Sequence, residues 1–160
     1  MKKVNDFIVY GTRGVFKIID IEQDETDSEK GYYVLKQVDG SMVIKTPVNN
    51  SKVIRDVLTE SEVNELIEGM PEVEPIWLND SRKRSLKFRE MIESGKTKDL
   101  IKVVKTLYLK NKELTENYKK MTFRDKELLN DAQKLLYAEF GFALNIPSDQ
   151  VEEYILERVS

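Results

Sequence analysis

The sequence predicts an α+β fold in which a small β domain comes first and an all-α domain of about four to five helices follows. Up to about Thr59, short runs rich in β-branched and aromatic residues alternate with glycine-containing turns, a pattern typical of strands. From Thr59 onward, apolar residues recur every three or four positions, which is the spacing of amphipathic helices. Several short strands with tight turns in so few residues indicate a strongly bent sheet or a small barrel.

The first two strands are expected over Asp6–Tyr10 and Val15–Ile21, which are apolar or alternating in character. Between them, Gly11–Gly14 has a glycine at each end, as tight turns often do, and we expect Arg13 at its exposed tip. Gln23–Gly31 contains no apolar residue and several acidic ones. The sequence therefore predicts a solvated acidic loop after the second strand.

A β-hairpin is expected next. Tyr32–Lys36 and Met42–Lys45 have the composition of strands, and Asp39-Gly40 lies between them. An Asp-Gly pair between two such runs is a strong hairpin signal. Pro47 should end the second strand of the hairpin, because proline has no backbone N–H to donate.

The helical half begins with a capping box made by Thr59 and Glu62, in which each residue satisfies a backbone donor of the other. Val63, Leu66, Ile67 and Met70 follow at helical spacing. Gly69–Pro75 contains two prolines and is the expected linker. We therefore predict two domains, over residues 1–70 and 71–160.

Four more helices are expected after the linker, starting near Asn79–Ser81, Thr97, Thr122 and Ser148. Thr122 and Ser148 are the expected N-caps of the last two, since Thr and Ser are good N-caps. Their apolar stripes should form the core of the helical domain. The stripe residues are Leu86, Met91 and Ile92; Leu100, Ile101, Val103, Val104, Leu107 and Tyr108; Leu128, Leu129, Ala132, Leu135, Leu136 and Phe140; and Val151, Tyr154 and Ile155.

The composition argues against an enzyme. The chain has no His and no Cys, so it lacks the commonest metal ligand, the commonest general base near neutral pH and every thiol. The acidic residues fall at polar positions of the expected helices and loops, so no carboxylate pair indicates catalysis. We expect no cofactor, no metal and no small-molecule substrate.

The chain is also expected to act in the cytoplasm without binding membranes. No apolar run approaches the roughly 20 residues that a membrane span needs. No apolar stretch follows Lys2 and Lys3, as it would in a signal peptide.

Gly95-Lys96-Thr97 has the ending of a phosphate-binding loop but not its beginning. Such a loop needs a glycine five positions before the second one, and position 90 is Glu. We predict a turn between two helices here, which leaves no basis for an ATPase.

The charge of the chain is unevenly distributed. Residues 1–70 hold 9 Lys and Arg against 13 Asp and Glu, residues 71–134 hold 16 against 11, and residues 135–160 hold 1 against 5. Five cations fall within eight residues of the basic middle, namely Arg82, Lys83, Arg84, Lys87 and Arg89. A cluster of this size on a helix is typical of a surface that binds a phosphate backbone, although it can also be a solvated helix face.

The chain as a whole resembles one family, the CarD/CdnL transcription regulators, whose N-terminal module also occurs in transcription-repair coupling factors. The resemblance in the first half lies in Asp6–Tyr10 with Gly14-Val15, Tyr33–Lys36, Val43–Pro47 and Ile54–Val57. In the second half it lies in Ser81–Arg84, Glu90–Gly95, Val103–Tyr108, Glu127–Leu129 and Ala132–Leu136.

The resemblance implies a Tudor-like or SH3-like barrel that binds the β subunit of RNA polymerase. Strand-edge pairing is the docking mode we expect, because an exposed edge offers unpaired backbone groups to a partner strand. Lys45 matches a family position usually held by Arg, so its contact would lack the bidentate fork of a guanidinium. The expected polymerase-binding residues are Lys45, Ile44, Thr46, Pro47 and Arg13.

The resemblance further implies a helical domain that contacts promoter DNA at the upstream edge of the transcription bubble, with little sequence preference, and stabilises the open complex. The expected DNA-binding residues are Arg82, Lys83, Arg84, Lys87, Arg89 and Trp77. The alternative is a module that binds polymerase or another protein without contacting DNA.

Trp77 departs from the family pattern. The family places a tryptophan wedge directly before the basic run, but alignment through Glu93–Gly95 puts Ser81 there, and Trp77 lies four residues earlier. Either the wedge acts from a shifted position or DNA contact is mainly electrostatic. Trp77 could also be a core residue that packs with Ile76 and Leu78.

Overall fold

The structure, a computed structural model, describes residues 2–24, 26–50 and 53–159. The chain forms two compact units, Met1–Leu58 and Thr59–Ser160. The boundary thus lies earlier than the one expected after residue 70. The reason is that helix α1 (Glu60–Glu68) packs on α4 (Phe123–Leu144) and α5 (Val151–Val159), so it belongs to the helical unit.

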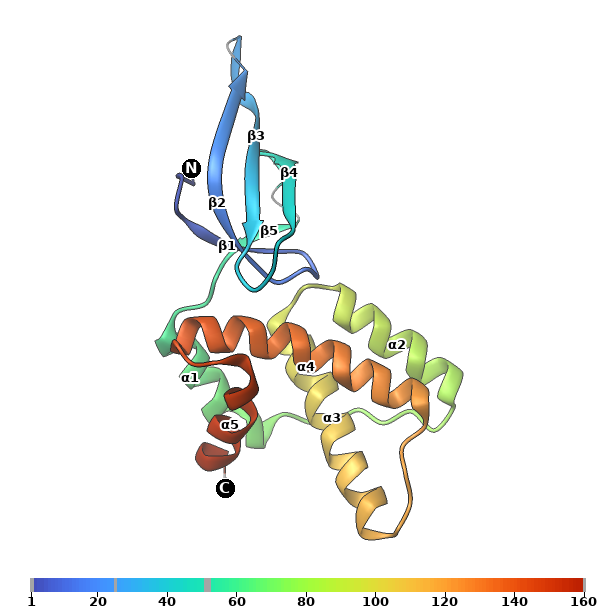
Figure 1. Ribbon diagram of the computed structural model, residues 1–160. Coiled ribbons are helices and arrows are strands. Elements are labelled where there is room, and N and C mark those ends of the chain that lie inside the picture. The colour runs from blue at the N-terminus through green and yellow to red at the C-terminus, as the bar shows by residue number, and fades with distance from the viewer. Residues whose placement is uncertain (1, 25, 51–52, 160) are drawn as a thin grey trace. The chain divides into compact units, whose positions relative to one another are not determined.

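The first unit is a five-stranded antiparallel sheet with the strand order β4-β3-β2-β1-β5 (Figure 1). Its core consists of Ile8, Phe16, Ile18, Tyr33 and Leu35, which are all at most 4% exposed. This sheet, followed by helices, confirms the α+β class and is consistent with a Tudor-like β domain. The strands are β1 (Phe7–Tyr10), β2 (Val15–Asp24), β3 (Asp27–Gln37), β4 (Val43–Pro47) and β5 (Ile54–Asp56).

The tight turn between β1 and β2 is confirmed. The Tyr10 N–H donates to the Gly14 carbonyl at 3.0 Å. Gly11 and Gly14 have φ values of +48° and +97°, in the region that favours glycine because it has no Cβ. Arg13 is exposed at the tip of this turn.

The loop expected over Gln23–Gly31 is wrong for the described residues of this segment, although Gln23, Thr26 and Lys30 are exposed as expected; residue 25 lies outside the described ranges. β2 and β3 continue into this segment and pair there, with Gln23 opposite Gly31, and Figure 1 shows them extending together beyond β1 and β4. A Cβ on Gly31 would lie 2.7 Å from the Glu22 carbonyl oxygen, so only glycine fits this close approach. Antiparallel pairing satisfies the backbone whatever the side chains are, so a ribbon can be polar on both faces.

The described residues of the second unit form five α-helices and two short 3₁₀ helices. They are α1, η1 (Met70–Glu72), α2 (Ser81–Glu93), α3 (Thr97–Glu116), α4, η2 (Ser148–Gln150) and α5. The predicted caps at Thr59 and Thr122 are confirmed, because their side chains accept hydrogen bonds from the first turns of α1 and α4. Asp80 caps α2 in the same way. Ser148 begins η2 instead of capping α5.

The core of the helical unit follows the predicted stripes with one correction. Leu86 is 66% exposed, whereas Phe88 is fully buried in its place. Two helical positions differ by about 200° around the axis, so these two residues lie on nearly opposite faces of α2. The predicted stripes of α3 and α4 are otherwise confirmed by buried Leu100, Ile101, Val103, Val104, Leu107, Leu128, Ala132, Leu136 and Phe140.

The expected linker Gly69–Pro75 lies inside the helical unit. We call residues 70–78 the strap, and Figure 1 shows it leading from α1 past α3 toward α2. The Lys105 ammonium on α3 donates to the carbonyls of Met70, Pro71 and Val73 at 2.8, 3.0 and 2.6 Å. These bonds hold the first residues of the strap, from Met70 to Val73, against α3, so a segment that resembles a linker in sequence is part of the helical unit.

Candidate functional site

Strand β4 is an edge of the sheet and, in the described part of the chain, pairs with a strand on one side only, β3. Its other side therefore offers backbone N–H and C=O groups to a partner strand. Side chains alternate along β4, with Val43, Lys45 and Pro47 exposed on one face. The edge presents one cation between two apolar side chains.

The opposite face of β4 points into the β unit. Ile44 packs against the core cluster, and Thr46 is 1% exposed. The expectation that Thr46 binds polymerase is therefore wrong for its side chain, because a buried hydroxyl cannot reach a partner. Only the backbone of this residue lies at the edge.

Lys45 is held in place by its neighbours in the sheet. Its ammonium forms a salt bridge with Glu22 and lies 5.0 Å from the ring centroid of Tyr32. The hydrogen bond with Glu22 raises the pKa of Lys45, because it favours the charged form. The side chain remains 53% exposed, so the cation is oriented and still accessible.

Arg13 lies beside the residue that precedes β4. One of its guanidinium nitrogens donates to the Met42 sulfur at 3.8 Å. This contact joins the β1–β2 turn to the β3–β4 loop, so Arg13 adds a second cation at the start of the β4 edge.

In the helical unit, Arg84 and Asp125 form a buried ion pair. Arg84 Nε and Nη2 donate to the two carboxylate oxygens of Asp125 at 3.0 and 2.9 Å. The side chains are only 5% and 6% exposed. The expectation that Arg84 binds DNA is therefore wrong, because its donors are bound inside the unit and out of reach of phosphates.

Trp77 lies against this pair. The Arg84 guanidinium carbon is 4.1 Å from the indole centroid, and the Lys110 ammonium is 4.9 Å from it. The indole is half-buried, so it is neither a sealed core residue nor a free surface group. Both cations therefore lie within the distance of about 6 Å at which cation–π interactions form with the indole.

The remaining cations of the cluster divide by exposure. Arg82, Lys83 and Lys87 are exposed on α2. Arg89 is partly buried and bonds Asp131 on α4 at 3.0 Å. Three of the five predicted cations are therefore directed to solvent.

The first turn of α4 adds residues that sequence reasoning missed. Asp125 lies in this turn, so its bond to Arg84 brings the starts of α2 and α4 together. Phe123 is 81% exposed there, and Arg124 and Lys126 are also exposed. We call Trp77, the exposed cations of α2 and these three residues the α2–α4 surface.

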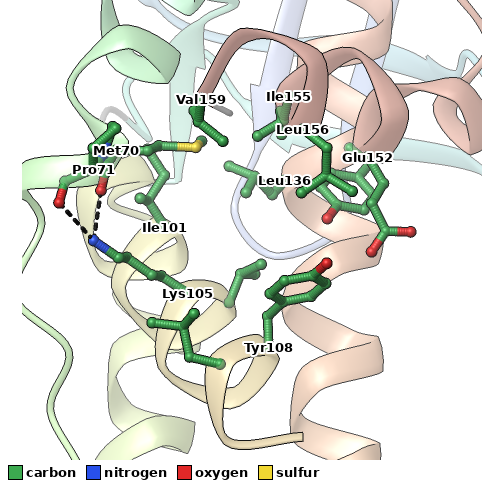
Figure 2. A pocket seen from close by; sticks show the side chains of 13 residues that line it. Met70, Pro71, Ile101, Lys105, Tyr108, Leu136, Glu152, Ile155, Leu156 and Val159 are labelled. Atoms are coloured by element: carbon green, nitrogen blue, oxygen red, sulfur yellow. Dashed lines mark hydrogen bonds between the residues drawn. The ribbon is translucent and has the colours of Figure 1, made fainter. Parts of the chain in front are cut away.

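The helical unit also contains a mostly apolar cavity of about 200 Å³. Figure 2 shows its lining, with the Lys105 ammonium turned toward the carbonyls of Met70 and Pro71. Burial raises the pKa of the Tyr137 phenol to about 12, and the charge of Glu152 adds to the effect. Since Lys105 is already bound, the cavity suits an apolar group and not a polar substrate.

The described residues contain no group of three or more His, Cys, Asp or Glu that could hold a metal ion. Within the same ranges, no helix is long and apolar enough to cross a membrane.

Comparison with protein families agrees with the two units. Residues 3–58 match the model of the CarD-like/TRCF RID domain. Residues 62–156 match the model of the CarD C-terminal domain. A search of curated proteins gave no match. The two matches cover nearly the whole chain in the expected order, so the protein is associated with transcription and interacts with RNA polymerase, and it belongs to the CarD/CdnL family.

Proposed function

We propose that this protein binds the β subunit of RNA polymerase through the β4 edge and promoter DNA through the α2–α4 surface, and so stabilises the open complex. The observation that carries the DNA half is the half-buried indole of Trp77, which lies against Arg84 of helix α2, the helix that also presents exposed Arg82, Lys83 and Lys87. An aromatic wedge beside phosphate-binding cations suits the upstream edge of a bubble, where base steps are already unstacked.

The β4 edge supports the polymerase half of the proposal. A partner strand added at this edge would meet Lys45 between Val43 and Pro47. Backbone pairing would supply affinity and the three side chains would supply specificity.

Lys45→Gln tests the polymerase contact. It removes the charge without placing a second carboxylate beside Glu22. We expect about five- to tenfold weaker binding to the polymerase β subunit, since a charge-assisted hydrogen bond is lost. Lys45→Arg should bind at least as tightly as the parent, because a guanidinium offers a bidentate fork. Lys98→Gln, at an exposed position on α3, is the control for the change in charge. Equal binding by folded Lys45→Gln and the parent would place the interface elsewhere.

The salt dependence of DNA binding tests the other half. With three exposed cations of α2 on phosphates, the logarithm of the affinity of the full chain for a bubble-containing duplex should fall against log salt with a slope of about −2 to −3. Neutralising these three cations should reduce the slope by about that amount. The matched control neutralises three other lysines of the unit, Lys98, Lys102 and Lys134.

Two outcomes would replace the DNA half. A parent that binds polymerase but shows no DNA binding at low salt is a protein-interaction module without DNA contact. A slope that the control variant changes as much as the α2 variant would mean that DNA contact is not specific to this surface.

A further inference from the structure

We propose that Arg84, together with Asp125, is a positioning residue that holds the indole of Trp77 in one orientation on the α2–α4 surface before DNA binds. The inference rests on the proposed DNA contact, and it assigns to the buried cation a role other than binding phosphate. Two features of the structure carry it: the hydrogen bonds of the Arg84 guanidinium, and the position of their backbone acceptors directly after Trp77 in the chain. A second ion pair on the same helices, which differs in both features, serves as a comparison.

All three nitrogens of the Arg84 guanidinium donate hydrogen bonds. Nε and Nη2 bond Asp125, and Nη1 donates to the carbonyls of Leu78 and Asn79 at 2.8 and 3.4 Å. A planar guanidinium with its edge occupied in this way has no rotational freedom left. What remains is its flat face, and the Trp77 ring centroid lies 4.1 Å from its carbon.

These bonds fix both the ring and the backbone of the wedge. Leu78 and Asn79 directly follow Trp77 in the chain, so Arg84 binds the backbone on the C-terminal side of the residue whose ring it contacts. On the N-terminal side, the Ile76 N–H donates to the Thr106 hydroxyl on α3 at 3.0 Å. The end of the strap is thus held on both sides of Trp77.

A purely packing role would not require this pair. A buried ion pair can often be replaced by apolar side chains of similar volume without loss of stability. An apolar replacement of Arg84 could fill the space but could not bond the carbonyls of Leu78 and Asn79. Such a variant would lose the fixed orientation of Trp77. DNA binding would then be weaker, because the indole would have to be ordered during binding.

The same two helices contain a comparison pair. Arg89 on α2 bonds Asp131 on α4 at 3.0 Å, but these side chains are 39% and 44% exposed. Arg89 forms no ring contact with Trp77 among the described residues. The two pairs therefore share residue types and helices and differ in contact with the indole.

The experiment uses Trp77 as its own probe, because it is the only tryptophan in the chain. The variant combines Arg84→Met with Asp125→Leu, and the control combines Arg89→Met with Asp131→Leu. Time-resolved fluorescence anisotropy and acrylamide quenching are measured on the free full-length protein, with circular dichroism as a check of folding. We expect faster local motion of the indole and at least about twofold stronger quenching in the variant, and parent-like values in the control.

If the double variant does not fold, Arg84→Lys takes its place. It keeps the charge beside Asp125 but loses the fork that reaches Leu78 and Asn79, so the same increase in indole motion is expected. Parent-like indole motion and quenching in either folded variant would overturn the proposal.

A double-mutant cycle with Trp77→Ala then links orientation to DNA. We expect the Arg84→Met/Asp125→Leu variant to bind a bubble-containing duplex about three- to tenfold more weakly than the parent, and to show little further effect once Trp77 is removed. An equal loss in the Trp77→Ala background would show that Arg84 acts independently of the indole and would overturn the proposal. A parent that does not bind the duplex contradicts the proposed function instead, while the fluorescence still decides whether Arg84 orients Trp77.

Discussion

Removing one partner of the buried ion pair should cost far more than removing the equivalent partner of the exposed one. Asp125→Ala leaves the Nε and Nη2 donors of Arg84 without the carboxylate in a site where the guanidinium is only 5% exposed. Breaking a buried pair in this way costs about 3–5 kcal/mol. A small domain has a free energy of unfolding of about 5–15 kcal/mol, so this loss is a large fraction of the total.

Asp131→Ala is the matched comparison, since Asp131 lies on the same helix and also bonds an arginine of α2. Because its pair is 39% and 44% exposed, its loss should cost about 0–1 kcal/mol. Urea unfolding followed by far-ultraviolet circular dichroism measures both values, because that signal reports the helical unit. Equal losses for the two variants would refute the argument, since they would show that the Arg84 guanidinium is as well solvated as that of Arg89.

Two further predictions concern pH and helix capping. The pKa of Tyr137 is about 12 against an ordinary value of 10.0, so the folded protein favours the protonated phenol. The contribution of this phenol to the free energy of unfolding is fully present below pH 10 and is lost as the pH rises toward 12. Tyr137→Phe should lose the highest step of the tyrosinate absorbance titration and flatten the fall in stability over that interval; an unchanged titration would contradict the assignment. Thr59→Ala removes one of the two 3.1 Å bonds of the capping box and should cost about 1 kcal/mol in urea unfolding. Glu62→Gln, which can still accept the other bond, should cost less than Thr59→Ala, and the reverse order would contradict the capping argument.

The sequence was sufficient wherever a few neighbouring residues determine the structure. The glycines of the β1–β2 turn, the Asp39-Gly40 hairpin and the caps at Thr59 and Thr122 are confirmed. Each depends on backbone geometry or on hydrogen bonds within about four residues. The family is confirmed as well, since its motifs extend along both units.

The two buried charges could have been found from the pattern of apolar residues. Asp125 precedes Leu128 and Ala132 at helical spacing, and Arg84 precedes Phe88 in the same way, so both lie on the apolar stripes of their helices. Opposite charges on two such stripes indicate a buried pair. Treating all acidic residues as lying at polar positions missed this signal.

Long-range contacts determined the rest. Gln23 and Asp24 pair with Asp27–Gly31 because β2 and β3 satisfy each other's backbone, and the strap is packed because Lys105, more than thirty residues away, binds its carbonyls. Arg84 changes from an expected DNA contact to an internal one because Asp125, 41 residues later, removes it from solvent. The sequence alone identified the cations and the tryptophan, but which of them face solvent depends on neighbours that only the folded chain brings together, because burial is a property of the packed unit and not of a residue or its sequence neighbours.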